Sequence, residues 1–462
     1  MNVTENLSIS PARWRTFSCP EHAAVAYTET GVVSAGEFHR RVAGISRRLL
    51  QRPEQRWALV CDDTLWFATS FMALAQAHKT VILPQASGPG NVAEARAEAV
   101  LTDQPARFAS FASMDVTAAA ESGAQLATDL DDGLLIEAYT SGSTGRPKCV
   151  NKQLGHFRAE ITVLDAQWGT MLGDALVLAS VPHHHLYGML FRVLWPLWAG
   201  RPFYAPTCAQ PFEFNAAAKR FGRCFIASSP ALLTRVTDFG LLQPKDDFVA
   251  LFSSGAPLPE VTAAKIAGEL GRAAIEVYGS TETGGIAWRS WQADAGQPAW
   301  RIFAQVETTL AETPRGRLRV RSPWTVQADW VDTGDLAQLL PQRRLQLFGR
   351  ADSVLKVEDK RVSLAEMEQR LVTHEFVKEA RLILLEGKRR SMGAVVVLSD
   401  AGLRSVEQDG TSGVRKLLVE WLRNWYDLVL LPRKWRFVES LPRNDMGKTE
   451  RAWLQALFTE RR

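Results

Sequence analysis

The sequence predicts an α/β protein of two domains, and three observations support this. The chain has 462 residues, more than one hydrophobic core usually serves. Over most of its length, short apolar strand candidates alternate with helical patterns, as in a parallel sheet with helices on its faces. Near residue 350 this alternation gives way to a shorter series of strands and helices. We therefore expect a large domain of parallel and mixed sheets with flanking helices over residues 1–349, and a small α+β domain over residues 350–462.

The large domain begins with a strand–helix–strand pattern at residues 58–61, 65–77 and 80–83. Four further strand candidates end beside Ser, Gly or Pro, at residues 134–136, 175–179, 224–227 and 249–252. Ligands of parallel sheets bind beyond the carboxyl ends of the strands. The small residues that follow these strands are therefore expected to lie at a ligand-binding edge.

The pattern changes from Gly316 onward. Residues 317–321 and 345–348 alternate between apolar and polar, as half-exposed strands do. The expected elements of the small domain are strands at 353–357, 380–385 and 394–398, helices at 365–373 and 413–425, and a turn at 442–447. We expect the domain boundary between residues 349 and 353.

Composition limits the function classes. A formal net charge of +4 is too small to indicate nucleic-acid binding. Basic residues gather at 388–390 and at 433–436, which is consistent with solvated surface or with a docking face for an acidic partner. Five dispersed cysteines are typical of a reducing compartment. Without a signal-like N-terminus or a long apolar stretch, the chain is expected to be cytoplasmic and to have no membrane span.

Residues 140–148 form a loop suited to phosphates. Glycines let backbone N–H groups approach phosphate oxygens, hydroxyls add donors and a lysine adds charge. The loop contains Thr140, Ser141, Gly142, Ser143, Thr144, Gly145 and Lys148. It lacks the Walker pattern, which argues against a P-loop NTPase. Flexible surface turns share this composition, so the loop alone does not assign a function.

Further segments supply groups for a nucleotide. Residues 278–282 offer the aromatic face of Tyr278 for a base, small residues for close approach and the carboxylate of Glu282 for Mg²⁺. Asp335 offers a carboxylate for a ribose diol, and Arg350 adds a cation. Near the C-terminus, Lys448 lies on a turn from which it could reach an active site.

With these motifs in this order, the chain resembles the adenylate-forming superfamily of acyl- and aryl-CoA synthetases, peptide-synthetase adenylation domains and luciferases, from Ala24 to Leu457. The resemblance implies ATP and Mg²⁺ as cofactors. It implies that Thr140 to Gly145 hold the β- and γ-phosphates. It assigns the adenine border to Ser254, Gly255, Ala256 and Tyr278, and it counts Gly279, Ser280, Thr281 and Lys148 among the other ATP-binding residues. Asp335 would bind the ribose, Arg350 the ribose or phosphate, and Glu282 the metal.

The resemblance also implies a mechanism in two steps. A carboxylic acid attacks the α-phosphate to give acyl-AMP and pyrophosphate. Lys448 bridges the two like charges, because a desolvated cation is needed between them. The small domain, acting as a lid, then rotates about Asp352 and admits a thiol. Lys448, Glu282 and Thr140 are thus the expected catalytic residues.

Residues 182–188 match the segment that lines the acid pocket in the family. The three consecutive histidines in it point in different directions, so binding of a metal by all three is not expected. By resemblance, His185 is an aromatic gate, and Tyr187, Gly279 and Gly284 border the acid, with the glycines leaving space. The absence of aspartate between residues 182 and 200 argues against an amino acid. Trp195 and Trp198 lie in a helix that is apolar nearly all round, so core packing is expected for them.

The acceptor remains open between an acyl carrier protein and CoA. Asp359 stands where the family usually has a glycine beside the pantetheine path, which argues against ordinary use of CoA. The compact chain resembles ligases that load a hydroxybenzoate-like starter acid onto an acidic carrier protein in aryl-polyene or xanthomonadin-type pigment pathways. The alternatives are an aryl- or medium-chain acyl-CoA synthetase, or an ATP-binding regulatory protein with a degenerate site.

Overall fold

The computed structural model describes residues 14–459 except 119–121, 125, 142–146, 239–244, 292–297, 313, 327–328, 352–353, 358–359, 386–390, 425, 427, 429–430 and 444–448. By their internal contacts these residues form two compact units. Unit 1 is Met1–Pro298 with Ile302–Glu307 and Arg321–Val331, and unit 2 is Ala299–Arg301, Thr308–Val320 and Asp332–Arg462. The expected domain boundary between residues 349 and 353 stays a prediction, since unit 2 as grouped by contacts also takes in residues 308–320 and 332–349.

The first sheet of unit 1 has six strands in the order β6-β5-β3-β4-β7-β8. These strands are β3 (Arg56–Leu59), β4 (Thr80–Leu83), β5 (Ala99–Thr102), β6 (Ser113–Asp115), β7 (Leu135–Ser141) and β8 (Pro147–Gln153). All neighbours in it are parallel except β7 and β8. After the phosphate-type loop, the chain therefore returns as strand β8, the hairpin partner of β7, and does not enter a helix. Val150 and Lys152, two residues apart, are both buried, as expected for one face of a strand that pairs with β7.

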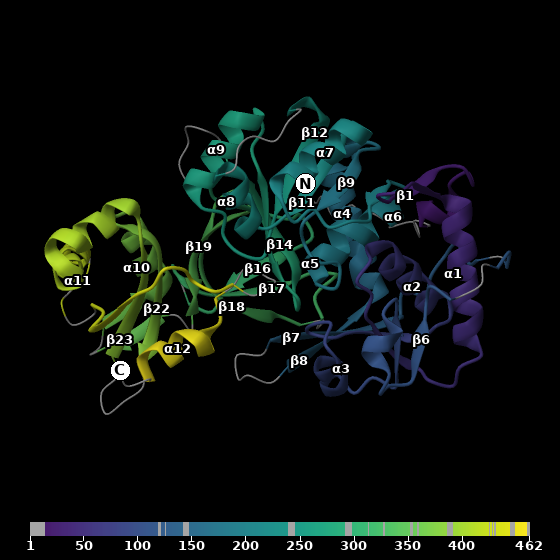
Figure 1. Cartoon of the computed structure of the whole chain (residues 1–462), viewed down its shortest axis with the longest axis horizontal. Helices are drawn as coiled ribbons and strands as arrows, with labels where there is room; N and C mark the ends of the chain where they lie inside the picture. Colours follow the sequence, from purple (N-terminus) through teal and green to yellow (C-terminus); the bar gives the residue numbers. More distant parts are fainter. Residues whose placement is uncertain are drawn as a thin grey trace, which may run out of the picture. The chain divides into compact units, whose positions relative to one another are not determined.

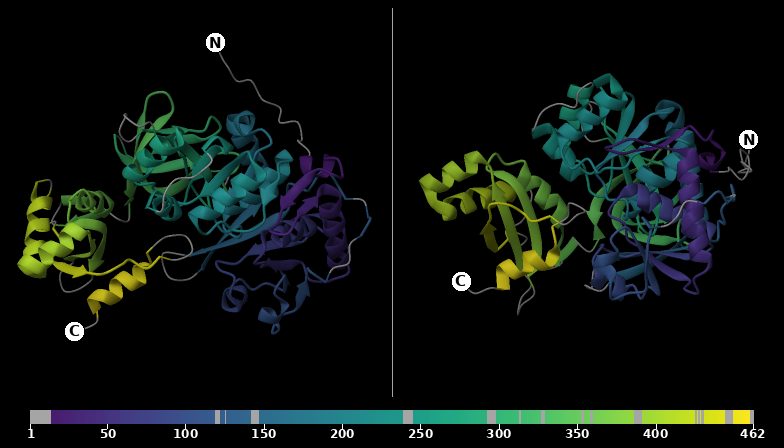
Figure 2. Two further views of the ribbon diagram at one scale, coloured as in Figure 1. Left: turned by 45° about the horizontal axis from the view of Figure 1, so that its top comes forward. Right: turned by 45° about the vertical axis from the view of Figure 1, so that its right-hand side comes forward.

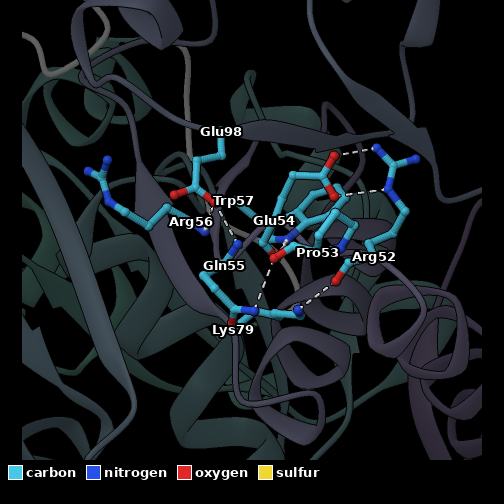
Figure 3. A network of polar contacts seen from close by, with 8 residues as sticks. All are labelled: Arg52, Pro53, Glu54, Gln55, Arg56, Trp57, Lys79 and Glu98. Carbon is cyan, nitrogen blue, oxygen red and sulfur yellow. Dashed lines mark hydrogen bonds and ion pairs between the residues drawn. The ribbon is translucent and has the colours of Figure 1, made fainter.

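Polar contacts hold the N-terminal ends of these strands (Figure 3). The Glu98 carboxylate accepts the backbone N–H groups of Gln55 and Arg56 at 2.7 and 3.3 Å. The buried Lys79 ammonium donates to the Arg52 carbonyl at 2.9 Å. Because the strands are parallel, this network lies opposite the edge at which ligands of such sheets bind.

The second sheet of unit 1 has the order β14-β13-β12-β11-β9-β10-β1-β2. Its strands are β1 (Ala24–Tyr27), β2 (Val32–Ser34), β9 (Leu176–Ala179), β10 (Phe203–Tyr204), β11 (Cys224–Ser228), β12 (Phe248–Ser253), β13 (Ile275–Ser280) and β14 (Gly284–Ser290). The strands from β1 to β13 in this order are parallel to their neighbours, and β2 and β14 run antiparallel to β1 and β13. The expected α/β architecture with parallel and mixed sheets is confirmed.

Helices fill the space between the two sheets. These are α2 (Thr64–Gln76), α4 (Leu154–Leu172) and a continuous stretch of α5 (Leu186–Gly188), the π-helix η3 (Met189–Leu194) and α6 (Trp195–Ala199). Helix α2 contacts β3 and η3, and α4 contacts β8 and β12. Trp195 and Trp198 are buried, which confirms core packing for both.

Other helices cover the outer faces of unit 1 (Figures 1 and 2). They are η1 (Arg15–Ser18), α1 (Ala35–Leu50), α3 (Pro89–Glu94), η2 (Pro105–Phe108), α7 (Pro211–Phe221), α8 (Pro230–Asp238), η4 (Lys245–Asp247) and α9 (Glu260–Leu270). Phe214 of α7, Leu233 of α8 and Ile266 of α9 share a core with β9, β11 and β12. The expected helices and strands thus exist where the apolar patterns predicted them.

Unit 2 holds strands in the order β16-β17-β18-β19-β15 and a hairpin of β20 and β21. Their bounds are β15 (Trp300–Ile302), β16 (Glu307–Leu310), β17 (Gly316–Arg321), β18 (Val331–Leu340), β19 (Arg344–Arg350), β20 (Val354–Val357) and β21 (Lys360–Ser363). The alternating strands expected from residue 317 onward are therefore present.

A three-stranded sheet with helices on both faces completes unit 2 (Figure 1). Its elements are α10 (Leu364–Val372), β22 (Val377–Leu385), β23 (Ser391–Leu398), α11 (Asp400–Arg423), β24 (Lys434–Phe437) and α12 (Arg451–Thr459). Even-numbered β23 residues such as Val396 pack with α10 and α11, whereas Val395 and Val397 pack with Leu454 of α12. The small α+β domain is confirmed. No helix among the described residues is long and apolar enough to cross a membrane.

Candidate active site

The carboxyl ends of β12 and β13 bring two predicted segments together. Strand β12 ends at Ser253 and leads into Ser254, Gly255 and Ala256, while Tyr278, Gly279 and Ser280 close β13. The two strands are parallel neighbours, so both segments lie at one edge. The Ser254 hydroxyl donates to the Val277 carbonyl at 2.8 Å and links them.

A buried carboxylate holds the turn that follows β12. Glu276 accepts the Leu258 backbone N–H at 2.8 Å with one oxygen. Its other oxygen accepts Arg289 Nε and Trp291 Nε1, both at 2.5 Å. The side chains of Glu276 and Arg289 are each only 2% exposed. The segment from Ser254 to Leu258 is therefore fixed against β13 and β14 by an ion pair that no sequence motif indicated.

Lys148 and Glu282 form an ion pair. Lys148 Nζ lies 2.7 Å from Glu282 Oε1, although 134 residues separate them in the chain. Burial alone would raise the pKa of Glu282, but the hydrogen bond and charge of Lys148 outweigh it, so the pKa lies below its usual value. Glu282 is thus an ionised carboxylate that already attracts a cation.

The hairpin of β7 and β8 positions the predicted phosphate loop. Thr140 pairs with Lys148 in the β7–β8 register, and its hydroxyl donates to the Lys148 carbonyl at 3.4 Å. The ends of the loop therefore lie beside the lysine that contacts Glu282. Ser141 is the last residue of β7. The described residues do not include Gly142, Ser143, Thr144 and Gly145.

Protein groups hold both ring nitrogens of His183, the first of the three consecutive histidines. Nε2 of the buried His183 is 2.8 Å from the Cys61 carbonyl, and Nδ1 is 2.9 Å from the Thr64 hydroxyl. Because a carbonyl only accepts, Nε2 carries the proton and Nδ1 accepts from Thr64. Burial holds the pKa of His183 well below its usual value. Both ring nitrogens of His183 are thus occupied by protein groups, which excludes it as a metal ligand.

Aromatic side chains lie behind the predicted acid pocket. The Tyr187 ring is 4.8 Å from Phe191, and Phe191 is 5.2 Å from Phe252. Trp168 of α4 continues the cluster, with ring centroids at 5.1 to 5.9 Å from Phe252, Trp288 and Phe303. These rings form one aromatic cluster between α4, η3, β12 and β14.

The predicted glycines have close neighbours. A Cβ at Gly279 would lie 2.1 Å from the Gly284 carbonyl oxygen. Gly284 has φ +62°, and its Cβ would meet Trp324 and Glu160 at 2.5 and 2.6 Å. The missing side chains therefore allow close packing of the protein on itself, and the acid-pocket role of these glycines stays a prediction.

Unit 2 brings Asp335 and Arg350 together. The two residues are opposite each other in the β18–β19 register. Arg350 Nη1 donates to the Thr333 carbonyl at 2.9 Å, and Gly334, at φ +74°, leaves room for the guanidinium. The carboxylate and cation predicted for the ribose are thus neighbours on two adjacent strands.

Comparison with known proteins identifies the family. Residues 13–327 match the family described as AMP-binding enzyme. The chain belongs to the AMP-binding enzyme family.

Individual relatives of this family member are distant. It is 26% identical over 408 residues to malonate–CoA ligase ACSF3, mitochondrial, of Bos taurus, covering 71% of this chain and 66% of the relative. It is 28% identical over 323 residues to 4-coumarate–CoA ligase of Halorhodospira halophila, covering 67% and 74%. The chain thus spans slightly less than two thirds of the bovine relative's length.

Solved structures share the fold. ATP-bound MatB from Rhodopseudomonas palustris superposes with a TM-score of 0.81 at 18% identity, covering 97% of this chain and 99% of that one. The O-succinylbenzoate Coenzyme A synthetase MenE from Bacillus subtilis, in complex with AMP, gives 0.82 at 17% identity, covering 98% and 99%. At these identities the likeness establishes the fold.

Several predicted residues of this AMP-binding enzyme lie outside the described part. They are Gly142, Ser143, Thr144, Gly145, Asp352, Asp359 and Lys448. Their roles stay predictions. Sequence analysis missed Glu160, Lys152 and Glu276, which are buried charges near the site. The sequence does indicate the burial of Lys152, because it follows Val150 by two residues and therefore lies on the same face of β8.

Proposed function

We propose that this protein uses ATP to activate a carboxylic acid and then transfers the acyl group to a thiol. The Lys148–Glu282 ion pair beside the phosphate-type loop carries this proposal, because it gathers a phosphate-binding cation and a metal-binding carboxylate at one edge. The Ser254–Val277 contact links the ends of two neighbouring strands and supports an adenine border there. Relatives named as CoA ligases support the reaction class.

In the first step, the acid's carboxylate oxygen attacks the α-phosphorus. The bond from that phosphorus to the oxygen bridging to the β-phosphate breaks, and pyrophosphate leaves. Lys448 would stabilise the charge that gathers between the acid and the phosphate. In the second step a thiolate attacks the acyl carbon, forming the thioester and releasing AMP.

Glu282 suits Mg²⁺, because its carboxylate oxygen is a ligand that magnesium prefers and its lowered pKa keeps it ionised. When bound with ATP, the metal would neutralise phosphate charge. Lys148, which now pairs with Glu282, would turn to the phosphates of the nucleotide.

We propose a small aromatic acid of the hydroxybenzoate type as the substrate. The aromatic cluster from Tyr187 to Trp168 would close the inner end of the acid pocket, and in that case it would disfavour medium-chain fatty acids. Tyr187, a partly exposed member of the cluster, would offer its ring for stacking against an aryl acid.

For the acceptor we propose the phosphopantetheine of an acyl carrier protein. Arg433, Lys434 and Arg436 are exposed on or beside the edge strand β24, where they could attract an acidic partner. The aryl-polyene or xanthomonadin type of pathway is the proposed setting. The names of the relatives favour CoA instead, so CoA is the second candidate.

The test is acid-dependent exchange of labelled pyrophosphate into ATP, across hydroxybenzoates, cinnamates and C4–C12 fatty acids, with Lys448→Ala in parallel. Exchange with aryl acids that the variant loses by about 10²–10³ supports the proposal. Thioester formation on CoA and on carrier protein then decides the acceptor. ATP binding without exchange for any acid would instead indicate a degenerate regulatory site.

A further inference from the structure

A buried carboxylate on α4 has no part in the proposed reaction. Glu160 is only 5% exposed, and its Oε1 accepts a hydrogen bond from the backbone N–H of Gly285 at 2.7 Å. Buried carboxylates are rare unless they are hydrogen-bonded or paired. Gly285 lies three residues after Glu282, so this contact falls on the turn that carries the predicted metal ligand.

A second side chain holds the same residue from its other end. The Trp324 indole donates to the Gly285 carbonyl at 3.0 Å, and Lys152 Nζ donates to the Trp324 carbonyl at 2.9 Å. Trp324 and Lys152 are each 1% exposed. The peptide groups on both sides of Gly285 are therefore fixed by buried side chains.

These contacts extend to Glu282 itself. The Val326 backbone N–H donates to the Glu282 carbonyl at 3.1 Å, two residues from Trp324. Gly284, at φ +62°, lies so close to Glu160 and Trp324 that no Cβ would fit. The turn from Glu282 to Gly285 is thus held between α4 and the segment around Trp324.

The charges in this cluster balance. Lys152 and Lys148 lie on the same face of β8, and they bring two cations toward the carboxylates of Glu160 and Glu282. Burial raises the pKa of Glu160 and lowers that of Lys152, while the charge of each favours the ionised form of the other. Removing one partner would leave the other buried without compensation.

We propose that Glu160 is a positioning residue that, together with Lys152, holds the Glu282–Gly285 turn so that the Glu282 carboxylate faces the magnesium of bound ATP. This inference rests on the proposed function. Glu160 acts through the backbone of Gly285 and contacts neither metal nor nucleotide.

The test is the variant Glu160→Gln, which keeps the size and an oxygen acceptor but removes the charge. Calorimetric titration of Mg²⁺ into the ATP-saturated protein should show affinity weakened by about tenfold, the lower end of what residues behind a metal ligand contribute. ATP affinity measured in EDTA should stay unchanged, because the turn would matter for the metal and not for the base.

Glu368→Gln is a matched control. Glu368 on α10 of unit 2 accepts the Leu382 N–H at 2.7 Å, lies 3.9 Å from Arg381 and has a pKa raised by burial. It reproduces the chemistry of Glu160 outside the elements that form the Glu282 turn. Its substitution should leave the Mg²⁺ affinity at the wild-type value, and equal affinities for wild type, Glu160→Gln and Glu368→Gln would overturn the proposal.

Lys152→Met supplies a second variant. It should weaken Mg²⁺ binding in the same direction, and the double variant with Glu160→Gln should be no weaker than the worse single one, because both act on one turn. A double variant weakened by the product of the two single factors would contradict a shared role. Wild-type pyrophosphate exchange separates the two proposals. If it occurs and Glu160→Gln binds Mg²⁺ normally, the positioning role alone fails, and if it is absent, the proposed function fails.

Discussion

Replacing Glu276 with alanine tests how the turn after β12 is held. The substitution leaves the Arg289 guanidinium buried without its counter-charge, since both side chains are 2% exposed. It also removes the acceptor of the Leu258 N–H and of the Trp291 indole. Breaking a buried ion pair by removing one partner typically costs about 3–5 kcal/mol. We expect a loss of unfolding free energy in that range for unit 1.

The assay is urea unfolding followed by tryptophan fluorescence. Glu37→Ala is the control, because Glu37 pairs with Arg41 at 2.5 Å in a partly exposed i,i+4 contact on α1. Such pairs contribute about 0.3–0.5 kcal/mol. Because the turn from Ser254 to Leu258 would border the adenine, the KM for ATP should rise in Glu276→Ala and not in Glu37→Ala. If both variants lost the same small amount of stability, the reasoning about the buried pair would be wrong.

Three further changes have expected outcomes. Gly284→Ala should lower stability and abolish most pyrophosphate exchange, because φ +62° and neighbours at 2.5 Å oppose a Cβ. Gly268→Ala in α9 is the control. Its Cβ would meet nothing within 4 Å, so thermal unfolding should show no change in stability or a gain of up to about 1 kcal/mol. Lys148→Met should raise the pKa of Glu282 in the free enzyme, since burial is then less opposed. The acid limb of the exchange pH profile, measured at ATP well below its KM so that it reports the free enzyme, should move to higher pH, and an unshifted limb would contradict the ion pair. His183 stays neutral in the folded protein, so below about pH 6.5 the unfolded chain binds more protons and the free energy of unfolding decreases as the pH falls. His183→Asn should reduce the slope of this free energy against pH, measured from pH 7 to 5, by up to about one proton, and an unchanged slope would refute the assignment.

Local sequence patterns predicted most elements. Residues 80–83 form a strand as expected, and residues 248–253 and 224–228 extend the expected strands by one or two residues. The helix expected at 413–425 is the second part of α11, whose two parts meet at Gly410 with φ +70°. Apolar periodicity indicates such elements because burial on one face is repeated along the chain. It does not indicate whether the next strand returns as a hairpin, as β8 does after β7.

The motif residues could be named from the sequence, but their partners could not. Tyr278, Glu282 and Lys148 stand in recognisable segments, whereas Glu160 and Lys152 stand in an ordinary helix and strand. A buried charge is marked by what surrounds it in space, and its neighbours Gly285 and Trp324 are far away in the chain. Gly284 was expected to leave space for the acid, and only the structure shows that Trp324 and Glu160 pack where its Cβ would stand.

By itself, the sequence determined the α/β class, the two-part organisation and the order of the segments expected to bind phosphate, base and ribose, because these depend on periodicity and on residue type at short spacing. The tertiary structure decided which charges meet. Lys148 reaches Glu282 across 134 residues, and the buried pair of Glu276 and Arg289 forms across the β13–β14 hairpin. The strength of such contacts depends on burial and distance, and both arise only when strands and helices from separate parts of the chain pack together.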